Sequence, residues 1–150
     1  MKVVQVVNTI VTAVGTSTNV NTFDDSIPTT AELTTDLMTL TITPKSALNK
    51  LKIEIVCNIE RTAGIGQSTC ALFQDSIANA IAAVGWGDSS AYMIPIVFTH
   101  YMVSGTTNSS TFKVRAGSNN GGTITFNGIE SSRRFGGVMA SSITITEYEG

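Results

Sequence analysis

Hydrophobic and polar residues alternate one by one through much of this chain, which is the pattern of β-strands with one buried face. The longest example runs from Asn49 to Glu60, and charged or amide side chains occupy every second position of it. Its inward-facing residues are Leu51, Ile53, Ile55, Cys57 and Ile59. A strand with one apolar and one wet face belongs in an antiparallel sheet.

Shorter segments repeat this alternation and are separated by stretches rich in Gly, Ser and Asn. They lie at 38–42, 67–74, 112–116, 123–126 and 141–149. The shared inward parity predicts one core formed by Leu51, Ile53, Ile55, Phe112, Val114, Ile124, Phe126, Ile143 and Ile145. The loop at 117–122 is rich in residues that tolerate positive φ, and it predicts a hairpin between its flanking strands.

Two further segments depart from simple alternation. Residues 2–11 are apolar at both parities, which predicts a first strand buried on both faces. Residues 76–84 contain alanines that permit a helical turn, but the flanking pattern also fits a strand after a turn at Asp75-Ser76. We favour the turn followed by a strand, and we predict no long helix anywhere in the chain.

Residues 91–103 have apolar side chains on both faces, although the surrounding strands have a wet side. A second partner should therefore cover the outer face, and an identical subunit is the natural candidate because large exposed apolar patches are rare on monomers. The predicted subunit-interface residues are Tyr92, Ile94, Val97, Tyr101, Val103, Arg133 and Arg134.

The spacing of the segments predicts about eight to ten short strands, which is typical of an all-β antiparallel sandwich or jelly roll. A chain of 150 residues fits a single domain spanning 1–150. Charged residues make up 13% of the chain, about half the usual share. A net charge of -2 gives no electrostatic signature for nucleic acid. No apolar run approaches the ~20 residues that span a bilayer, so we expect no membrane insertion.

The sequence contains no recognisable catalytic or metal-binding pattern, and we expect a protein without enzymatic activity or cofactor. Cys57 and Cys70 fit small buried hydrophobes, with a disulfide between them as the alternative. His100 is the one histidine and lies at inward parity, which fits an interior or interface residue. Two Cys and one His do not supply a metal site in any recognised spacing. Polar residues interrupt the apolar N-terminus, so we expect no export signal there.

Trp86 is the candidate binding residue, because two glycines hold it in a predicted loop beside an acid and two hydroxyls. An indole with nearby polar groups suits a sugar, although a tryptophan that plugs one end of the sandwich fits the same pattern. The candidate receptor contacts are Trp86, Asp88, Ser89, Asn119 and Asn120. Arg133 and Arg134 fit an acidic glycan, a neighbouring subunit or a salt bridge to Glu130, and the salt bridge or interface is favoured.

Several blocks, taken in order, resemble the jelly-roll domains of bacteriophage tail fibres and other virion surface proteins, which are compared with the trimeric TNF and C1q domains. They are Lys2–Val7, Leu40–Ser46 followed by Asn49–Glu54, Ala71–Ser76, Thr111–Arg115, and the bend 133–140 that leads into Ser142–Ile145. The order of the blocks is more specific than any one of them.

The resemblance implies a non-enzymatic virion protein that forms a homotrimer and assembles in the host cytoplasm with other virion proteins. It favours the tip of a tail fibre or appendage that attaches to a host-surface glycan or protein. The alternative is a decoration or head-fibre protein that coats or stabilises the capsid. A non-viral adhesion or lectin-like module is the third alternative.

Overall fold

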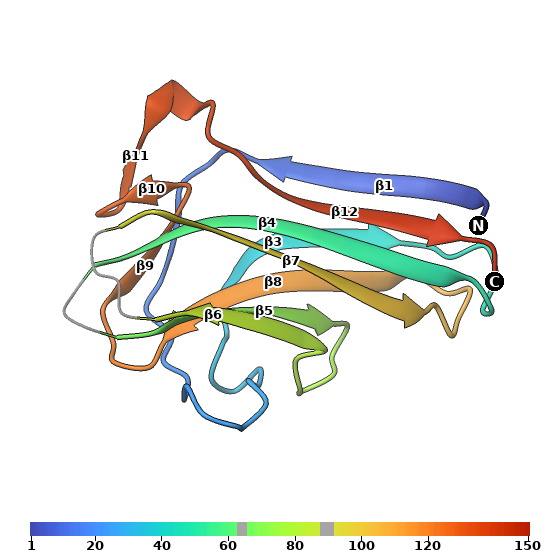
Figure 1. Ribbon diagram of the computed structural model, residues 1–150, viewed down its shortest axis with the longest axis horizontal. Helices are drawn as coiled ribbons and strands as arrows, with labels where there is room; N and C mark the ends of the chain where they lie inside the picture. The colour runs from blue at the N-terminus through green and yellow to red at the C-terminus, as the bar shows by residue number, and fades with distance from the viewer. Residues whose placement is uncertain (63–65, 88–91) are drawn as a thin grey trace.

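The computed structural model describes residues 1–62, 66–87 and 92–150, and its strands form two antiparallel sheets packed face to face (Figure 1). The first sheet contains β1 (Val3–Val11), β12 (Ser141–Tyr148), β4 (Lys50–Thr62) and β7 (Ile94–Val103), in that order. The short strands β9 (Thr123–Phe126) and β2 (Gly15–Ser17) extend the same sheet. The second sheet contains β3 (Asp36–Ile42), β8 (Ser110–Ser118), β5 (Ser68–Gln74) and β6 (Ala82–Trp86), in that order.

The chain passes from one sheet to the other at most of its connections, as between β3 and β4, β4 and β5, and β7 and β8. The resulting orders, β1-β12-β4-β7 opposite β3-β8-β5-β6, are those of an eight-stranded jelly roll. The remaining elements are a small hairpin of β10 (Gly128–Ile129) and β11 (Ser132–Arg133) and a 3₁₀ turn at Phe135–Gly137. The predicted all-β antiparallel sandwich is confirmed.

The inner faces of the two sheets enclose one hydrophobic core. All nine residues predicted to share this core are in it, and Leu72, Phe98 and Met38 join them. Cys57 and Cys70 are fully buried free thiols on opposite sheets, so they are small core residues and not a disulfide. A hydrogen bond between the two thiols, together with burial, raises the pKa of Cys57.

The outer face of the second sheet is covered by the long connection between β2 and β3. Leu33 from this connection packs against Ala71 and Phe73, which are fully buried on the outward parity of β5. Arg115 lies 5.2 Å from the centre of the Phe73 ring, and its Nε donates to Asp36 at 2.6 Å. The connection is therefore fixed against the sheet over part of its length.

The first strand was predicted to be buried on both faces, and this is wrong. β1 is an edge strand that pairs only with β12, and Val6 and Ile10 on its outer face are 56% and 64% exposed. The apolar residues at both parities reflect an edge with an exposed apolar side, which sequence alternation alone does not distinguish from a buried central strand.

The predicted hairpin at 117–122 is also wrong. β8 pairs with β3 and β5 in the second sheet, whereas β9 pairs with β4 and β2 in the first. The loop is a crossover between sheets, and its glycines at 121 and 122 adopt positive φ of 70° and 88°. The segment 76–84 does form a turn followed by a strand, as favoured, but β6 continues to Trp86, which was placed in a loop.

Two buried polar clusters hold the ends of the first sheet. At one end, the fully buried Glu147 accepts hydrogen bonds from Gln5, Asn49 and the backbone N–H of Lys45. At the junction where β4 changes partner from β12 to β9, Asn127 donates to the carbonyl of Val11 and accepts from the Ser141 hydroxyl. Buried polar groups are tolerated only when they are hydrogen-bonded in this way.

Candidate functional site

The outer face of β7 carries a row of exposed apolar side chains. Val97, Tyr101 and Val103 are 64%, 62% and 54% exposed on the parity that faces away from the core, with Thr99 between the first two. In the register with β4, Val97 lies beside Val56, whereas Tyr101 and Val103 lie beside Lys52 and Lys50. We call Val97, Tyr101 and Val103 the β7 surface. Aligned apolar side chains on an edge strand are typical of an interaction site.

An ion pair lies beside the β7 surface. The Lys52 ammonium lies 2.9 Å from the Glu54 carboxylate, and this hydrogen bond raises the pKa of Lys52. On the inner side of β7, burial lowers the pKa of His100. The charged side chains of β4 therefore lie next to the β7 surface, and Val97, Tyr101 and Val103 form the apolar edge of this face.

The other predicted interface residues lie outside this surface. Ile94 faces inward and packs against the core, and Tyr92 is 69% exposed just before β7 begins. Arg133 ends β11, and Arg134 follows it. Within the described ranges no ion pair joins either arginine to Glu130, so the expected salt bridge is not formed.

Those predicted receptor contacts that the structure describes lie at one end of the second sheet. Trp86 lies opposite Ser68, which in turn lies opposite Ser118 on β8, so Trp86 and the loop after Ser118 share this end. Asn119 accepts a hydrogen bond from the backbone N–H of Gln67 at 2.8 Å, and Asn120 is exposed beside it. Trp86 is 51% exposed and therefore does not fully plug the sandwich. Asp88 and Ser89 lie outside the described residues.

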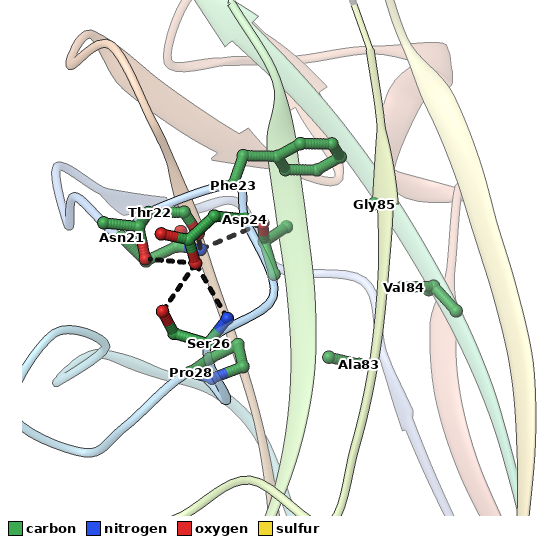
Figure 2. A pocket seen from close by; sticks show the side chains of 10 residues that line it. Asn21, Thr22, Phe23, Asp24, Ser26, Pro28, Ala83, Val84 and Gly85 are labelled. Carbon is green, nitrogen blue, oxygen red and sulfur yellow. Dashed lines mark hydrogen bonds between the residues drawn. The ribbon is translucent and has the colours of Figure 1, made fainter.

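A pocket that the sequence did not reveal lies between β6 and the loop after β2 (Figure 2). It has a volume of about 180 Å³ and is lined by Asn21, Thr22, Phe23, Asp24, Ser26, Pro28, Thr69, Ala83, Val84 and Gly85. Figure 2 shows the Phe23 ring extending toward Gly85. A Cβ at Gly85 would lie 2.3 Å from Cε2 of Phe23, so a side chain at this position would displace the ring from its place.

Asp24 shapes the loop of this pocket. Its carboxylate accepts hydrogen bonds from the backbone N–H and the hydroxyl of Ser26, at 2.8 and 2.6 Å, and from the Thr22 hydroxyl. The Ser26 hydrogen bonds lower the pKa of Asp24 despite a small opposing effect of burial. The interpretation of Asp24 as a turn-forming residue is consistent with this geometry, and the side chain carries a negative charge at neutral pH.

The bend before β12 projects a second apolar feature. Phe135 and Val138 are 75% and 82% exposed, and Phe135 has a φ of 54°.

Among the described residues no group of three or more His, Cys, Asp or Glu side chains could hold a metal ion. The described part of the chain also contains no helix long and apolar enough to cross a membrane.

No protein-family model matches this sequence, and no match to it is found among curated proteins. Solved structures with a similar fold include the infectious bursal disease virus Gt strain, at 13% identity and a TM-score of 0.45 over 97% of this chain. They also include the VP2 subviral particle of that virus, at 9% identity and a TM-score of 0.38 over 97% of this chain. The chain covers 38% and 42% of those chains. The jelly-roll assignment rests on the strand order and not on these similarities.

Proposed function

We propose that this protein is a non-enzymatic structural subunit of a virus particle, which coats or builds the shell by packing against copies of itself. The observation that carries the proposal is the β7 surface on a jelly roll whose interior is filled. Jelly rolls serve as viral capsid domains, lectins and cupins, and they bind ligands inside the barrel only where the interior has room. Here the inner faces of both sheets are occupied by the core.

Because the interior is filled, we infer that binding takes place on the outer surface. The β7 surface offers three large side chains, each more than half exposed, on a strand whose outer edge pairs with no other strand among the described residues. Burying each such side chain contributes on the order of 1.5–3 kcal/mol. Burying all three on a second copy, together with their counterparts, favours association and offsets part of the roughly 4–15 kcal/mol that lost translational and rotational freedom costs. We propose a homotrimer as the state that results.

The second candidate is a tail-fibre or tail-appendage tip that binds a host-surface glycan or protein. The observation that favours it is the half-exposed Trp86 at the same end as Asn119 and Asn120. An aromatic face beside amide groups can stack on the C–H face of a sugar and bind its hydroxyls. The shell role is preferred because the β7 surface is the more extensive apolar feature and requires no ligand beyond the protein itself.

Two measurements test the proposal. Light scattering or sedimentation should give a mass above the 15.8 kDa of one chain at micromolar concentration, and Val97→Lys should lower it by placing an unpaired charge in a dry contact. A control change, Thr39→Lys, adds the same charge at an exposed threonine of β3 in the other sheet, away from the β7 surface, and should leave the mass unchanged. A monomeric wild-type protein would refute self-association.

The number of copies of this protein in purified virus particles separates the shell role from the tail role. Hundreds of copies per particle fit a shell, and a few to a few dozen fit a tail.

A further inference from the structure

A second groove adjoins the pocket beside β6 and is built by two segments distant in sequence. The backbone N–H of Ala80 donates to Pro28, and that of Thr30 donates to Ala78, at 2.9 and 2.8 Å. These bonds hold the loop after β2 against the turn before β6. The groove between them has a volume of about 330 Å³ and is lined by Asp24, Asp25, Ser26, Ile27, Pro28, Ala80, Ile81, Ala82 and Ala83. We call it the β6 groove.

The β6 groove combines apolar walls with an acidic rim. Ile27, Pro28 and the run from Ala80 to Ala83 supply the apolar surface, and Ile27 is 55% exposed. Asp24 and Asp25 stand at its border, and the hydrogen bonds from Ser26 hold Asp24 in place. A cavity of about 150 Å³ is enough for a benzene ring. The β6 groove therefore has room for an aromatic side chain that is accompanied by positive charge.

The bend before β12 provides such a group. Phe135 and Val138 are among the most exposed large hydrophobic residues of the described chain, and Arg133 and Arg134 come directly before them. Phe135 has a φ of 54°, a backbone conformation that a bulky L-residue rarely adopts. The fold thus holds a phenyl ring in water at a strained position, and strain of this kind is found where a residue serves a function. We call residues 133–138 the Phe135 knob.

We infer that the Phe135 knob of one molecule inserts into the β6 groove of a second copy of this chain. The phenyl ring would enter the apolar part of the groove, and Arg133 and Arg134 would face Asp24 and Asp25 at its rim. Figure 1 shows the bend that follows β11 at the top of the molecule and the loop that follows β2 at the bottom. Because knob and groove lie on opposite sides, the contact is head-to-tail and produces a ring or a filament.

This inference rests on the proposal that the protein assembles with copies of itself, and it adds a contact that the β7 surface does not supply. In an open chain of such head-to-tail contacts, only the two terminal subunits keep a free knob or groove until a ring closes. The β7 surface and the head-to-tail contact can therefore operate together, and each can be removed without the other. This separation makes the two proposals distinguishable by experiment.

The first test is Phe135→Gly, measured by sedimentation velocity over a concentration series in both the wild-type and the Val97→Lys background. Glycine accepts a φ of 54° without strain, so the melting temperature should stay the same or rise. Loss of the phenyl group should weaken the head-to-tail association about 10- to 100-fold. A loss of association combined with unchanged or increased stability is not expected from a merely structural residue.

The second test is a charge exchange. Arg133→Glu/Arg134→Glu places acid against the acidic rim, and Asp25→Lys places base against the basic knob, so each variant alone should associate weakly. Mixed in equal amounts, the two variants should associate again, because the acidic knob meets the basic groove and the wild-type knob meets the wild-type groove. Lys2→Glu/Lys45→Glu, which changes the net charge equally at other exposed sites, should behave as wild type.

The results separate the proposals. The inference is overturned if Phe135→Gly and both charge variants associate like wild type, or if mixing the charge variants restores nothing. If Val97→Lys alone abolishes all association while the knob variants have no effect, the β7 surface stands and the knob contact fails. If the knob variants abolish association and Val97→Lys does not, the knob contact stands and the β7 surface fails.

Discussion

Glu147 is expected to be one of the main determinants of stability, because its carboxylate is fully buried and ties three segments together. Its Oε1 accepts from Asn49 at 2.6 Å and from the backbone N–H of Lys45 at 2.8 Å, and its Oε2 accepts from Gln5 at 2.5 Å. These donors come from β1, from the turn after β3 and from the residue just before β4. Glu147→Ala removes all three bonds at once and leaves the buried Asn49 amide without its acceptor.

The magnitude follows from opposing contributions. A hydrogen bond to a charged group contributes about 1.5–3 kcal/mol, so three of them are worth roughly 4.5–9 kcal/mol before the cost of burying the charge is subtracted. That cost is several kcal/mol for one ion. We expect Glu147→Ala to lower the free energy of unfolding by about 2–4 kcal/mol, within the upper range of single substitutions. Glu149→Ala, at a carboxylate that is 60% exposed, should change it by no more than about 0.5 kcal/mol.

The effect should depend on pH. Burial by itself raises the pKa of Glu147, but the hydrogen bonds from Asn49, Gln5 and the backbone of Lys45 and Ser46 together outweigh it, so the pKa is lowered from 4.5. A carboxyl whose folded pKa lies below its unfolded pKa stabilises the protein fully above the unfolded value, and the contribution is lost as the pH falls through the folded value. The difference between wild type and Glu147→Ala should therefore be largest at neutral pH and shrink below about pH 4.5.

Urea unfolding at fixed protein concentration, repeated between pH 7 and pH 3, measures this difference. Glu147→Gln serves as the matched variant, because it keeps the shape and some hydrogen bonds but cannot titrate. Its free energy of unfolding should be lower than that of wild type at pH 7, and the gap should close toward pH 3. If the gap between wild type and either variant stays constant over this range, the charged form of Glu147 is not the source of the stabilisation.

Two other substitutions test the fold. Asn127→Ala removes the hydrogen bonds to Val11, Ala13 and Ser141 and places alanine at a φ of 58°, so chemical denaturation should show a loss of about 2–4 kcal/mol. Asn127→Asp should lose at least as much, because it keeps the acceptor for Ser141 but sets a buried carboxylate oxygen against the Val11 and Ala13 carbonyls. Gly117→Ala would bring a Cβ within 2.5 Å of Leu33, so limited proteolysis should cut the connection between β2 and β3 faster than in wild type; equal cleavage rates would contradict its anchoring at Leu33.

The sequence predicted the core well because alternation reports directly which side of a strand faces inward. A shift of one residue would move a whole set of side chains to the opposite face, so the pattern around Ile53 or Val114 leaves little freedom. The same reasoning identified the outer parity of β7, where Val97, Tyr101 and Val103 are exposed as expected. Burial periodicity is a local property, and local properties can be read along the chain.

Pairing partners are not local, and the errors in prediction concern them. The loop at 117–122 has the composition of a hairpin turn, but the choice between pairing β8 with β9 and sending them to different sheets depends on β3, β5 and β4. β1 has apolar residues on both faces, and only its place at the edge leaves Val6 and Ile10 exposed. Composition does not determine where in the order of a sheet a strand lies.

The site beside β6 shows why the surface was harder to predict than the core. Gly85 and Gly87 suggested a loop around Trp86, yet Gly85 lies within a strand and is small because the Phe23 ring occupies the space of its side chain. The residues that explain this glycine lie about sixty positions earlier, in a segment whose own sequence indicated only a turn. The pocket and the β6 groove arise where that turn meets the edge of the sheet, and neither segment contains them alone. Function on a filled jelly roll therefore has to be sought on outer surfaces such as the β7 surface and in such contacts between distant loops, because the inner faces of the strands form the core.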